Sequence, residues 1–142
     1  MLFRSILDQK ISILFTGPVA AEMMMKVPIH PDLSNLELIF MGGAYVSVEK
    51  KSKFRQYLQE CGSDAGIYVG YGLTEAGGAV ILSERDADND YLGTPLPGVK
   101  IKIYDEESDS YQDVDGGAKT GALCISTKSL STGKLNDLNV FP

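Results

Sequence analysis

The sequence contains few of the residues on which several common kinds of protein chemistry depend. It has one histidine, His30, and two cysteines, Cys61 and Cys124, in 142 residues. A zinc site normally takes four His, Cys or carboxylate ligands, so a site at His30 would have to recruit carboxylates from elsewhere. Two cysteines so far apart in a chain without a secretory signal are expected to be free thiols in a reducing compartment. The sequence therefore predicts neither a zinc site nor a disulfide.

Positive charge and long apolar runs are also scarce. Thirteen Lys and Arg residues stand against nineteen Asp and Glu residues, so the formal net charge is −6. Such a charge repels phosphate backbones and anionic membranes, and nucleic acid is not an expected partner. No apolar run approaches the roughly 18 to 20 residues that span a bilayer, and Asp8 interrupts the apolar N-terminal stretch. We expect no membrane span and a cytoplasmic location.

The rest of the sequence, which is 44% apolar overall, alternates in the manner of an α/β protein. Short apolar segments are followed by glycine turns and then by segments with helix signals. This order favours a mostly parallel sheet with helices on both faces. The expected strands are 11–15, 36–41, 65–72 and 77–84, and the expected helices are 16–27 and 47–62, the second with Ser47 as its N-cap.

The character of the sequence changes after Glu84. The segment "RDADNDYLGTPLPG" contains glycines and prolines that prevent a regular element, so we predict an α/β subdomain at 1–90 and a partial β subdomain at 91–142. In the second, "VKIKIYD" alternates apolar and polar residues and is expected to pair with "GALCIST" in a small antiparallel sheet. The aspartates of "DADND" imitate a calcium loop, but Tyr91 occupies the position of its required glycine.

Two glycine-containing loops follow strands of the expected parallel sheet. "MGGAY" contains Gly42 and Gly43, and "GYGLTEAGG" contains Tyr71, Thr74 and Glu75. Ligands bind beyond the carboxyl ends of parallel strands, so both loops face the binding edge. Glycines let a ligand approach the backbone, an aromatic ring can lie on a purine, and a hydroxyl and a carboxylate can serve phosphate and Mg²⁺. Each residue also has an ordinary explanation, as a tight turn, half-buried packing or a solvated carboxylate.

These motifs together resemble the adenylate-forming superfamily. "GYGLTEAGG", with "MGGAY" upstream and "GTPLPGVKIKIYD" downstream, is most similar to AMP-forming acyl-CoA synthetases, and the superfamily also includes luciferases and peptide-synthetase adenylation domains. The similarity runs through nearly the whole chain. It implies that the backbone of one loop lines the adenine of ATP or AMP, that Tyr71 stacks on this adenine, and that the set extends to the phosphate. The implied cofactor-binding residues are Gly42, Gly43, Ala44, Tyr71, Gly72 and Thr74.

The resemblance places catalysis in the second loop. It implies that Thr74 contacts phosphate, that Glu75 holds Mg²⁺, and that the small residues Ala76, Gly77 and Gly78 border the acyl pocket. The implied reaction is attack of a carboxylic acid on the α-phosphorus of ATP, which yields an acyl-adenylate and pyrophosphate, followed by acyl transfer to coenzyme A, as in fatty acid metabolism. The acid could be a short-, medium- or long-chain acid or an aromatic acid.

Several parts of the family pattern are absent from the sequence. These are the upstream phosphate loop, the downstream ribose-binding aspartate and the C-terminal domain with its lysine, and Ala122 follows Gly121 where the family commonly has glutamate. We therefore predict the central fragment of a synthetase, which needs the N- and C-terminal parts of its parent chain and does not catalyse alone. The alternatives are a non-catalytic scaffold domain that retains the fold, and a small sugar- or phosphate-binding α/β module outside the family.

Overall fold

The computed structural model describes residues 6, 8–114 and 119–132, which belong to two compact units. The first unit comprises residues 1–71 and 81–94, and the second comprises residues 72–80 and 95–142. Compared with the predicted boundary near residue 90, this division transfers the segment 72–80 to the second unit. The predicted boundary of the subdomains stays a prediction.

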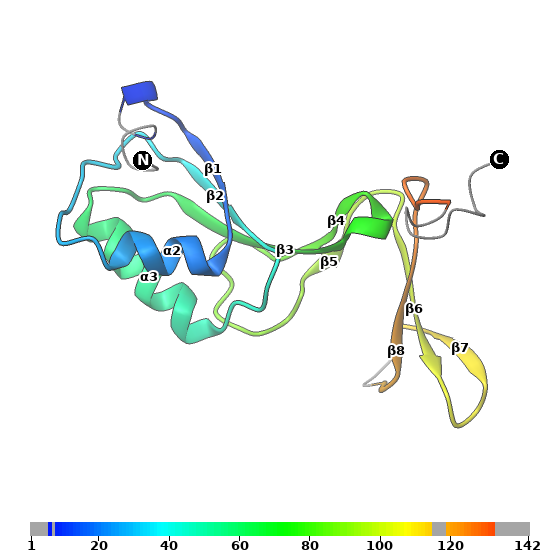
Figure 1. The fold of residues 1–142 in the computed structure, drawn as a ribbon. Coiled ribbons are helices and arrows are strands. Elements are labelled where there is room, and N and C mark those ends of the chain that lie inside the picture. Colours follow the sequence, from blue (N-terminus) through cyan, green and yellow to red (C-terminus); the bar gives the residue numbers. More distant parts are fainter. Residues whose placement is uncertain (1–5, 7, 115–118, 133–142) are drawn as a thin grey trace. The chain divides into compact units, whose positions relative to one another are not determined.

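A five-stranded sheet with the order β1-β2-β3-β4-β5 begins in the first unit (Figure 1). Its first three strands pair in parallel, with Phe15 opposite Phe40 and Phe40 opposite Tyr68. Only four residues separate β3 from β4, and so short a connection permits only a hairpin. The bounds are Ile13–Thr16 for β1, Leu38–Met41 for β2, Gly66–Leu73 for β3, Gly78–Leu82 for β4 and Thr94–Pro95 for β5. The short β5 lies in the segment that was predicted to contain no regular element, because pairing with β4 orders its backbone.

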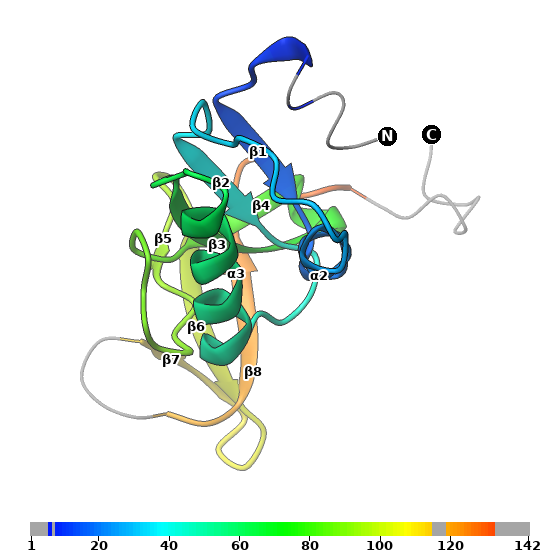
Figure 2. The ribbon, with the colours of Figure 1, turned by 90° about the vertical axis from the view of Figure 1, so that its left-hand side faces the viewer.

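Two helices lie side by side on one side of the parallel strands, as Figures 1 and 2 show. The helix α2 (Pro18–Met25) starts with a proline at a position where the missing N–H costs nothing, and Gly17 is its N-cap. The helix α3 (Val48–Glu60) is capped by Ser47, whose hydroxyl accepts a hydrogen bond from the Lys50 N–H at 3.3 Å. The helices predicted at 16–27 and 47–62 are both present, with shorter ends.

The hydrophobic core of the first unit lies between these helices and the sheet. Side chains alternate along a strand, so Leu14 and Ile39 point into the core whereas Phe15 and Phe40 point to the opposite face. Cys61 is buried in this core, and both cysteines are free, as predicted. The core residues of strands and helices include Leu14, Met24, Ile39, Met41, Phe54, Leu58 and Ile67.

The second unit contains a three-stranded antiparallel sheet with the order β7-β6-β8. The strand β6 (Lys100–Asp105) pairs with β8 (Ala122–Ser126), which confirms the predicted pairing of the segments 99–105 and 121–127. The strand β7 (Ser110–Asp113) was not predicted, because its polar residues lack a strand pattern and its order comes from backbone pairing with β6. A Cβ on Gly121 would lie 2.2 Å from the Tyr104 carbonyl oxygen, so only glycine fits before β8.

The predicted fold class is confirmed as an α/β protein with a mostly parallel sheet and a separate small antiparallel sheet. The described helices α2 and α3, however, lie on one face of this sheet (Figure 1) and not on both faces as predicted. Among the residues that the structure describes, no helix is long and apolar enough to cross a membrane.

Candidate functional site

A row of three glycines crosses the parallel strands, directly after the ends of β1 and β2 and within β3. The Gly42 N–H donates to the Thr16 carbonyl at 3.1 Å, which continues the parallel pairing beyond β1. A Cβ on Gly17 would lie 3.5 Å from the Gly42 carbonyl oxygen, and a Cβ on Gly42 would lie 3.0 Å from that of Gly70. Three neighbouring positions on adjacent strands therefore carry no side chain, and the backbone is the surface that a ligand would meet there.

The sequence holds a signal for this row that the analysis of single loops missed. The sequence of each parallel strand includes an aromatic residue that is followed by one further residue and a glycine: "FTG" at 15–17, "FMG" at 40–42 and "YVG" at 68–70. Only the second glycine was predicted as a site residue. Because the strands pair in register, equal spacing along each strand brings the three glycines side by side.

The loop after β2 approaches the strand that leads into Tyr71. Gly42 lies against Gly70, and Gly43 follows with φ of +81°, a conformation that favours glycine. A Cβ on Gly43 would meet no atom within 4 Å, and Gly43 and Ala44 are exposed. The first unit thus brings Gly42 against Gly70, the residue before the half-buried Tyr71, and leaves Gly43 and Ala44 open to solvent.

The predicted phosphate-side residues form one turn in the second unit. Thr74–Ala76 is a single 3₁₀ turn, which the Gly77 N–H closes by donating to the Thr74 carbonyl at 3.1 Å. Gly77 has φ of +80°, and a Cβ there would lie 3.0 Å from the Cβ of Ser129. Both the backbone conformation and the neighbouring serine therefore require glycine after the turn.

Two serines anchor this turn from a distant part of the sequence. The Ser131 N–H donates to the Glu75 carbonyl at 2.6 Å, and the Ser129 hydroxyl donates to the Ala76 carbonyl at 2.7 Å. With Gly77 on the remaining carbonyl, all three carbonyl groups of the turn are bonded. The sequence analysis missed both serines, because no local pattern shows that the segment 129–131 returns to residues 75 and 76.

The side chains of the turn differ in exposure. Ala76 is buried, Glu75 is half-buried and Thr74 is exposed, so the hydroxyl that was predicted to contact phosphate is accessible to a ligand. The described residues contain no group of three or more His, Cys, Asp and Glu that could hold a metal ion. The role of Glu75 as a Mg²⁺ ligand therefore stays a prediction.

Gly72 has a structural reason of its own. A Cβ at this position would lie 2.0 Å from the Gly78 carbonyl oxygen, because β3 and β4 approach closely at the base of the turn. The geometry therefore explains this glycine by packing, and its role in cofactor binding stays a prediction.

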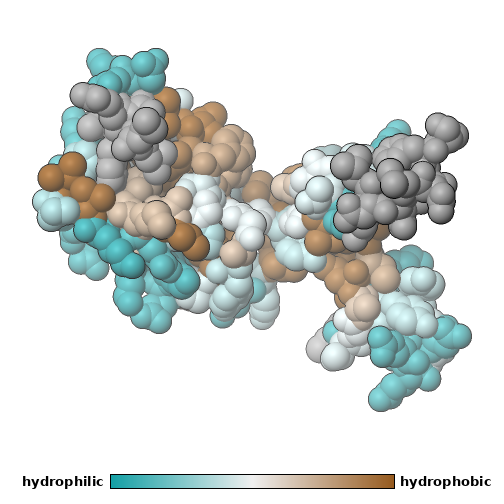
Figure 3. Space-filling view, viewed as in Figure 1, coloured by the Kyte–Doolittle hydropathy of each residue, from teal (hydrophilic) through white to brown (hydrophobic). Residues whose placement is uncertain are grey.

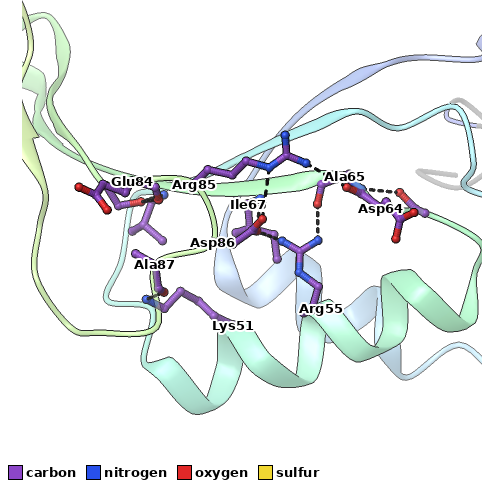
Figure 4. A network of polar contacts seen from close by, with 12 residues as sticks. Lys51, Arg55, Asp64, Ala65, Ile67, Glu84, Arg85, Asp86 and Ala87 are labelled. Atoms are coloured by element: carbon purple, nitrogen blue, oxygen red, sulfur yellow. Dashed lines mark hydrogen bonds and ion pairs between the residues drawn. The ribbon is translucent and has the colours of Figure 1, made fainter.

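A polar network holds the loop 84–90 against α3 in the first unit (Figure 4). The Asp86 carboxylate accepts a hydrogen bond from the Ile67 N–H at 2.8 Å and pairs with Arg55, whose guanidinium also donates to the Ala65 carbonyl. Asp86 thus connects β3 with α3.

Lys51 closes the same loop from the other side. Its ammonium group donates to the carbonyls of Ala87 and Asn89, both at 2.6 Å, and the residue is only 8% exposed. Asp90, at the end of this loop, accepts a hydrogen bond from the Tyr45 hydroxyl, which raises the pKa of Tyr45. The loop 87–90 therefore connects α3 with the end of the adenine-side loop.

A cavity of about 200 Å³ adjoins this network. It is separate from the predicted site, because none of the residues predicted to bind nucleotide lines it. Its lining consists of Val48, Lys51, Ser52, Arg55, Ile67, Asp86, Ala87 and Asp88.

Open backbone beside parallel strands, in the first unit, and a turn with an exposed hydroxyl, in the second, are each features of α/β proteins that bind nucleotides. The comparison with protein families specifies that class: the family model described as "AMP-binding enzyme" matches residues 1–134. The chain belongs to the AMP-binding enzyme family.

The individual relatives include a CoA ligase and a peptide synthetase. A 2-succinylbenzoate–CoA ligase of Salmonella typhimurium is 39% identical over 74 residues, which are 51% of this chain and 14% of the ligase. The nonribosomal peptide synthetase echPS of Aspergillus ruber is 25% identical over 139 residues, which are 93% of this chain and 6% of the synthetase. The chain therefore spans a small part of the relatives that it matches.

Solved structures share the fold at lower identity. A long-chain-fatty-acid–CoA ligase (FadD1) from Archaeoglobus fulgidus superimposes with a TM-score of 0.77 and 20% identity, over 92% of this chain and 27% of the ligase. The anthranilate CoA ligase AuaEII in complex with anthranoyl-AMP gives a TM-score of 0.76 and 19% identity, over 92% of this chain and 24% of that one.

Proposed function

We propose that residues 1–142 supply the adenine-side and phosphate-side loops of an ATP-dependent, AMP-forming acid–CoA ligase. The observation that carries the proposal is the turn Thr74–Ala76, whose three carbonyl groups are bonded by protein donors while the Thr74 side chain is exposed. A turn held through its backbone keeps its side chains in one place, which is what a site for phosphate and its metal ion needs. Membership of the family and the CoA ligase among the relatives support the proposal.

The first unit binds the adenine in this proposal. The backbone of Gly42, Gly43 and Ala44 lines the base, and Tyr71 stacks on it. The glycine row supports this assignment, because a flat ring can approach a strand edge closely where no Cβ intervenes. Gly72 belongs to the same binding set.

The second unit provides the groups that act on the phosphates. Thr74 contacts a phosphate oxygen, and Glu75 holds the Mg²⁺ that neutralises phosphate charge. Neutralisation and alignment allow a carboxylate to approach the α-phosphorus of ATP. A carboxylate oxygen bonds to that phosphorus as the bond to the departing pyrophosphate breaks. The sulfur of coenzyme A then attacks the acyl carbon, and AMP leaves.

The thiol acceptor has one alternative that a specific observation favours. The peptide synthetase matches 93% of this chain, although at 25% identity, whereas the CoA ligase matches 51% at 39%. A thiol on a carrier protein is therefore the second candidate for the acyl acceptor. Acyl transfer with free coenzyme A as the only thiol supports the first.

We also propose that these residues act as part of a longer cytoplasmic polypeptide and do not catalyse alone. The matched CoA ligases contain far more chain than the residues that align here, and the free thiols agree with a reducing compartment. If purified residues 1–142 converted ATP and a carboxylic acid to AMP and pyrophosphate, this part of the proposal would be wrong.

ATP–pyrophosphate exchange with a panel of carboxylic acids tests the function in the polypeptide that the complete gene encodes. We expect exchange that depends on one class of acid, and a loss of about 10²-fold or more in Glu75→Gln, because the ion loses its protein ligand. Glu84→Gln is the matched control, since Glu84 is an exposed carboxylate outside the proposed site, and its exchange should equal that of the wild type. Absence of exchange with every acid, or equal rates in the two variants, would contradict the proposal.

A further inference from the structure

The adenine-side loop, residues 42–45, is fixed at both of its ends but is exposed between them. At its start, the Gly42 N–H donates to the Thr16 carbonyl at 3.1 Å. Just after its end, the Val46 side chain is buried in the core of the first unit and is only 5% exposed. The three residues in between are all exposed. Burial therefore contributes little to holding the backbone that is proposed to line the adenine.

The loop 84–90 is held by both a strand and a helix of the first unit. Asp86 makes two hydrogen bonds with β3, one through its N–H at 2.7 Å and one through its carboxylate at 2.8 Å. From α3, the Lys51 ammonium donates to the carbonyls of Ala87 and Asn89, both at 2.6 Å. Figure 3 shows hydrophilic residues gathered over α3, and Lys51 differs from most of them in being only 8% exposed. Its side chain is directed into the loop and not into water.

Asp90 is the residue at which the two loops meet. The Asn89 side chain accepts a hydrogen bond from the Tyr91 N–H at 3.1 Å, and this contact closes a turn around Asp90. The Asp90 carboxylate accepts a hydrogen bond from the Tyr45 hydroxyl. Because Tyr45 is 69% exposed, this hydrogen bond, and not packing, connects the adenine-side loop with the loop 84–90.

These contacts lead back to the adenine-side loop from which they start. The adenine-side loop continues into α3, Lys51 of α3 holds the loop 84–90, and Asp90 of that loop bonds to Tyr45. A loop that samples several conformations binds a ligand more weakly, because the apparent affinity falls with the fraction of molecules in the competent conformation. Contacts that fix the loop before the ligand arrives remove this loss.

We propose that Lys51 and Tyr45 are positioning residues for the nucleotide, through which the loop 84–90 holds the adenine-side loop in its binding conformation. The inference rests on the proposed function in taking residues 42–44 as the backbone that lines the adenine. Neither side chain touches the nucleotide in this proposal. Loss of either one releases the same loop.

Calorimetric titration of AMP into the polypeptide that the complete gene encodes measures this effect. Tyr45→Phe removes the hydroxyl and keeps the ring, and Lys51→Met removes the donor and keeps the stem. We expect each substitution to raise the Kd for AMP by about 3- to 10-fold, which corresponds to the loss of one hydrogen bond. The double variant should bind AMP about as weakly as either single variant, because both substitutions break the same series of contacts.

Two matched controls and a second readout separate positioning from a general loss of stability. Lys53→Met removes an exposed lysine of the same helix, and Tyr91→Phe removes the hydroxyl of a ring that is 81% exposed; neither should change the Kd. In exchange assays, the two test variants should raise the KM for ATP and leave kcat unchanged, because the contacts act on the adenine and not on the phosphates. Circular dichroism at the temperature of the titration establishes that each variant is folded.

Several results would overturn the proposal and leave the proposed function intact. These are an unchanged Kd in Tyr45→Phe, additive effects in the double variant, or a fall in kcat with an unchanged KM. If Lys51→Met does not fold, Asp90→Ala, at an exposed position, replaces it in the double variant with the same expectation. Absence of AMP binding by the wild type would instead contradict the proposed function, and this inference with it.

Discussion

Replacement of Lys51 by methionine tests whether the clamp on the loop 87–90 stabilises the first unit. The Lys51 ammonium donates two hydrogen bonds of 2.6 Å to the carbonyls of Ala87 and Asn89, from a position that is 8% exposed. Methionine has a similar length and retains the packing of the stem, but it has no donor. The variant therefore isolates the hydrogen bonds from the volume of the side chain.

The expected loss follows from the number and kind of these bonds. A hydrogen bond to a charged group contributes about 1.5–3 kcal/mol. Two bonds are lost, but methionine avoids the desolvation of an ammonium group, and the exposed loop lets its carbonyls regain water. We therefore expect a net loss of about 2 kcal/mol in the free energy of unfolding. At about 4 °C per kcal/mol for a unit of this size, the Tm falls by about 8 °C.

Two assays check this value, and a variant on the same helix controls for it. Thermal unfolding is followed by far-UV circular dichroism, because the chain has no tryptophan. Hydrogen exchange should show amides of the loop 87–90 exchanging about 30-fold faster, the equivalent of about 2 kcal/mol. Lys53→Met removes an exposed lysine that pairs with Glu49 at 2.7 Å, and should change neither readout. Equal effects of the two substitutions would refute the role of the clamp.

Three further predictions concern the turn and the thiols. Gly72→Ala places a Cβ 2.0 Å from the Gly78 carbonyl oxygen and should lower the free energy of unfolding in urea by about 1–3 kcal/mol. Ala44→Ser, at an exposed position, should leave it unchanged. Equal urea midpoints for the two variants would show that the hairpin can relax. Ser129→Ala removes the donor to the Ala76 carbonyl, so it should lower the free energy of unfolding by about 0.5–1.5 kcal/mol and speed hydrogen exchange of the Gly77 amide. Ser131→Ala should change neither quantity, because Ser131 bonds to Glu75 through its backbone. Identical exchange in the two variants would mean that the turn needs no anchor. Burial raises the pKa of the Cys61 thiol, so less thiolate forms at pH 8. Cys61 should therefore react with a disulfide reagent more slowly than Cys124, and the difference in rate should become smaller as the pH rises. Equal rates at pH 8 would contradict the burial of Cys61.

Local patterns predicted the elements of this fold well where one segment contains the whole signal. Ser47 caps α3 as expected, and the alternation in "VKIKIYD" became β6, paired with the predicted partner β8. The strand β7 was missed because its residues, "SYQD", have no apolar period. Its backbone is ordered by hydrogen bonds to the open edge of β6. Such backbone pairing does not require a particular side-chain pattern, so the sequence of β7 does not indicate it.

Some residues of the candidate site could likewise be identified from the sequence, and others could not. Thr74 and Glu75 could be chosen from the motif, because a hydroxyl and a carboxylate among glycines suit phosphate and Mg²⁺. The anchoring role of Ser129 could not, since 53 residues separate it from Ala76. Gly72 was chosen for ligand binding, and its contact with Gly78 shows a steric requirement that a list of motifs does not contain.

The sequence by itself determined the α/β class, the places of the main strands and helices, and the residue types that a nucleotide would need, because these depend on periodicity, capping and side-chain chemistry within short segments. Only the tertiary structure decided that "FTG", "FMG" and "YVG" lie in register, so that three glycines form one row and three rings form one ladder. Register depends on hydrogen bonds between strands that are far apart in the chain, and no single segment encodes it.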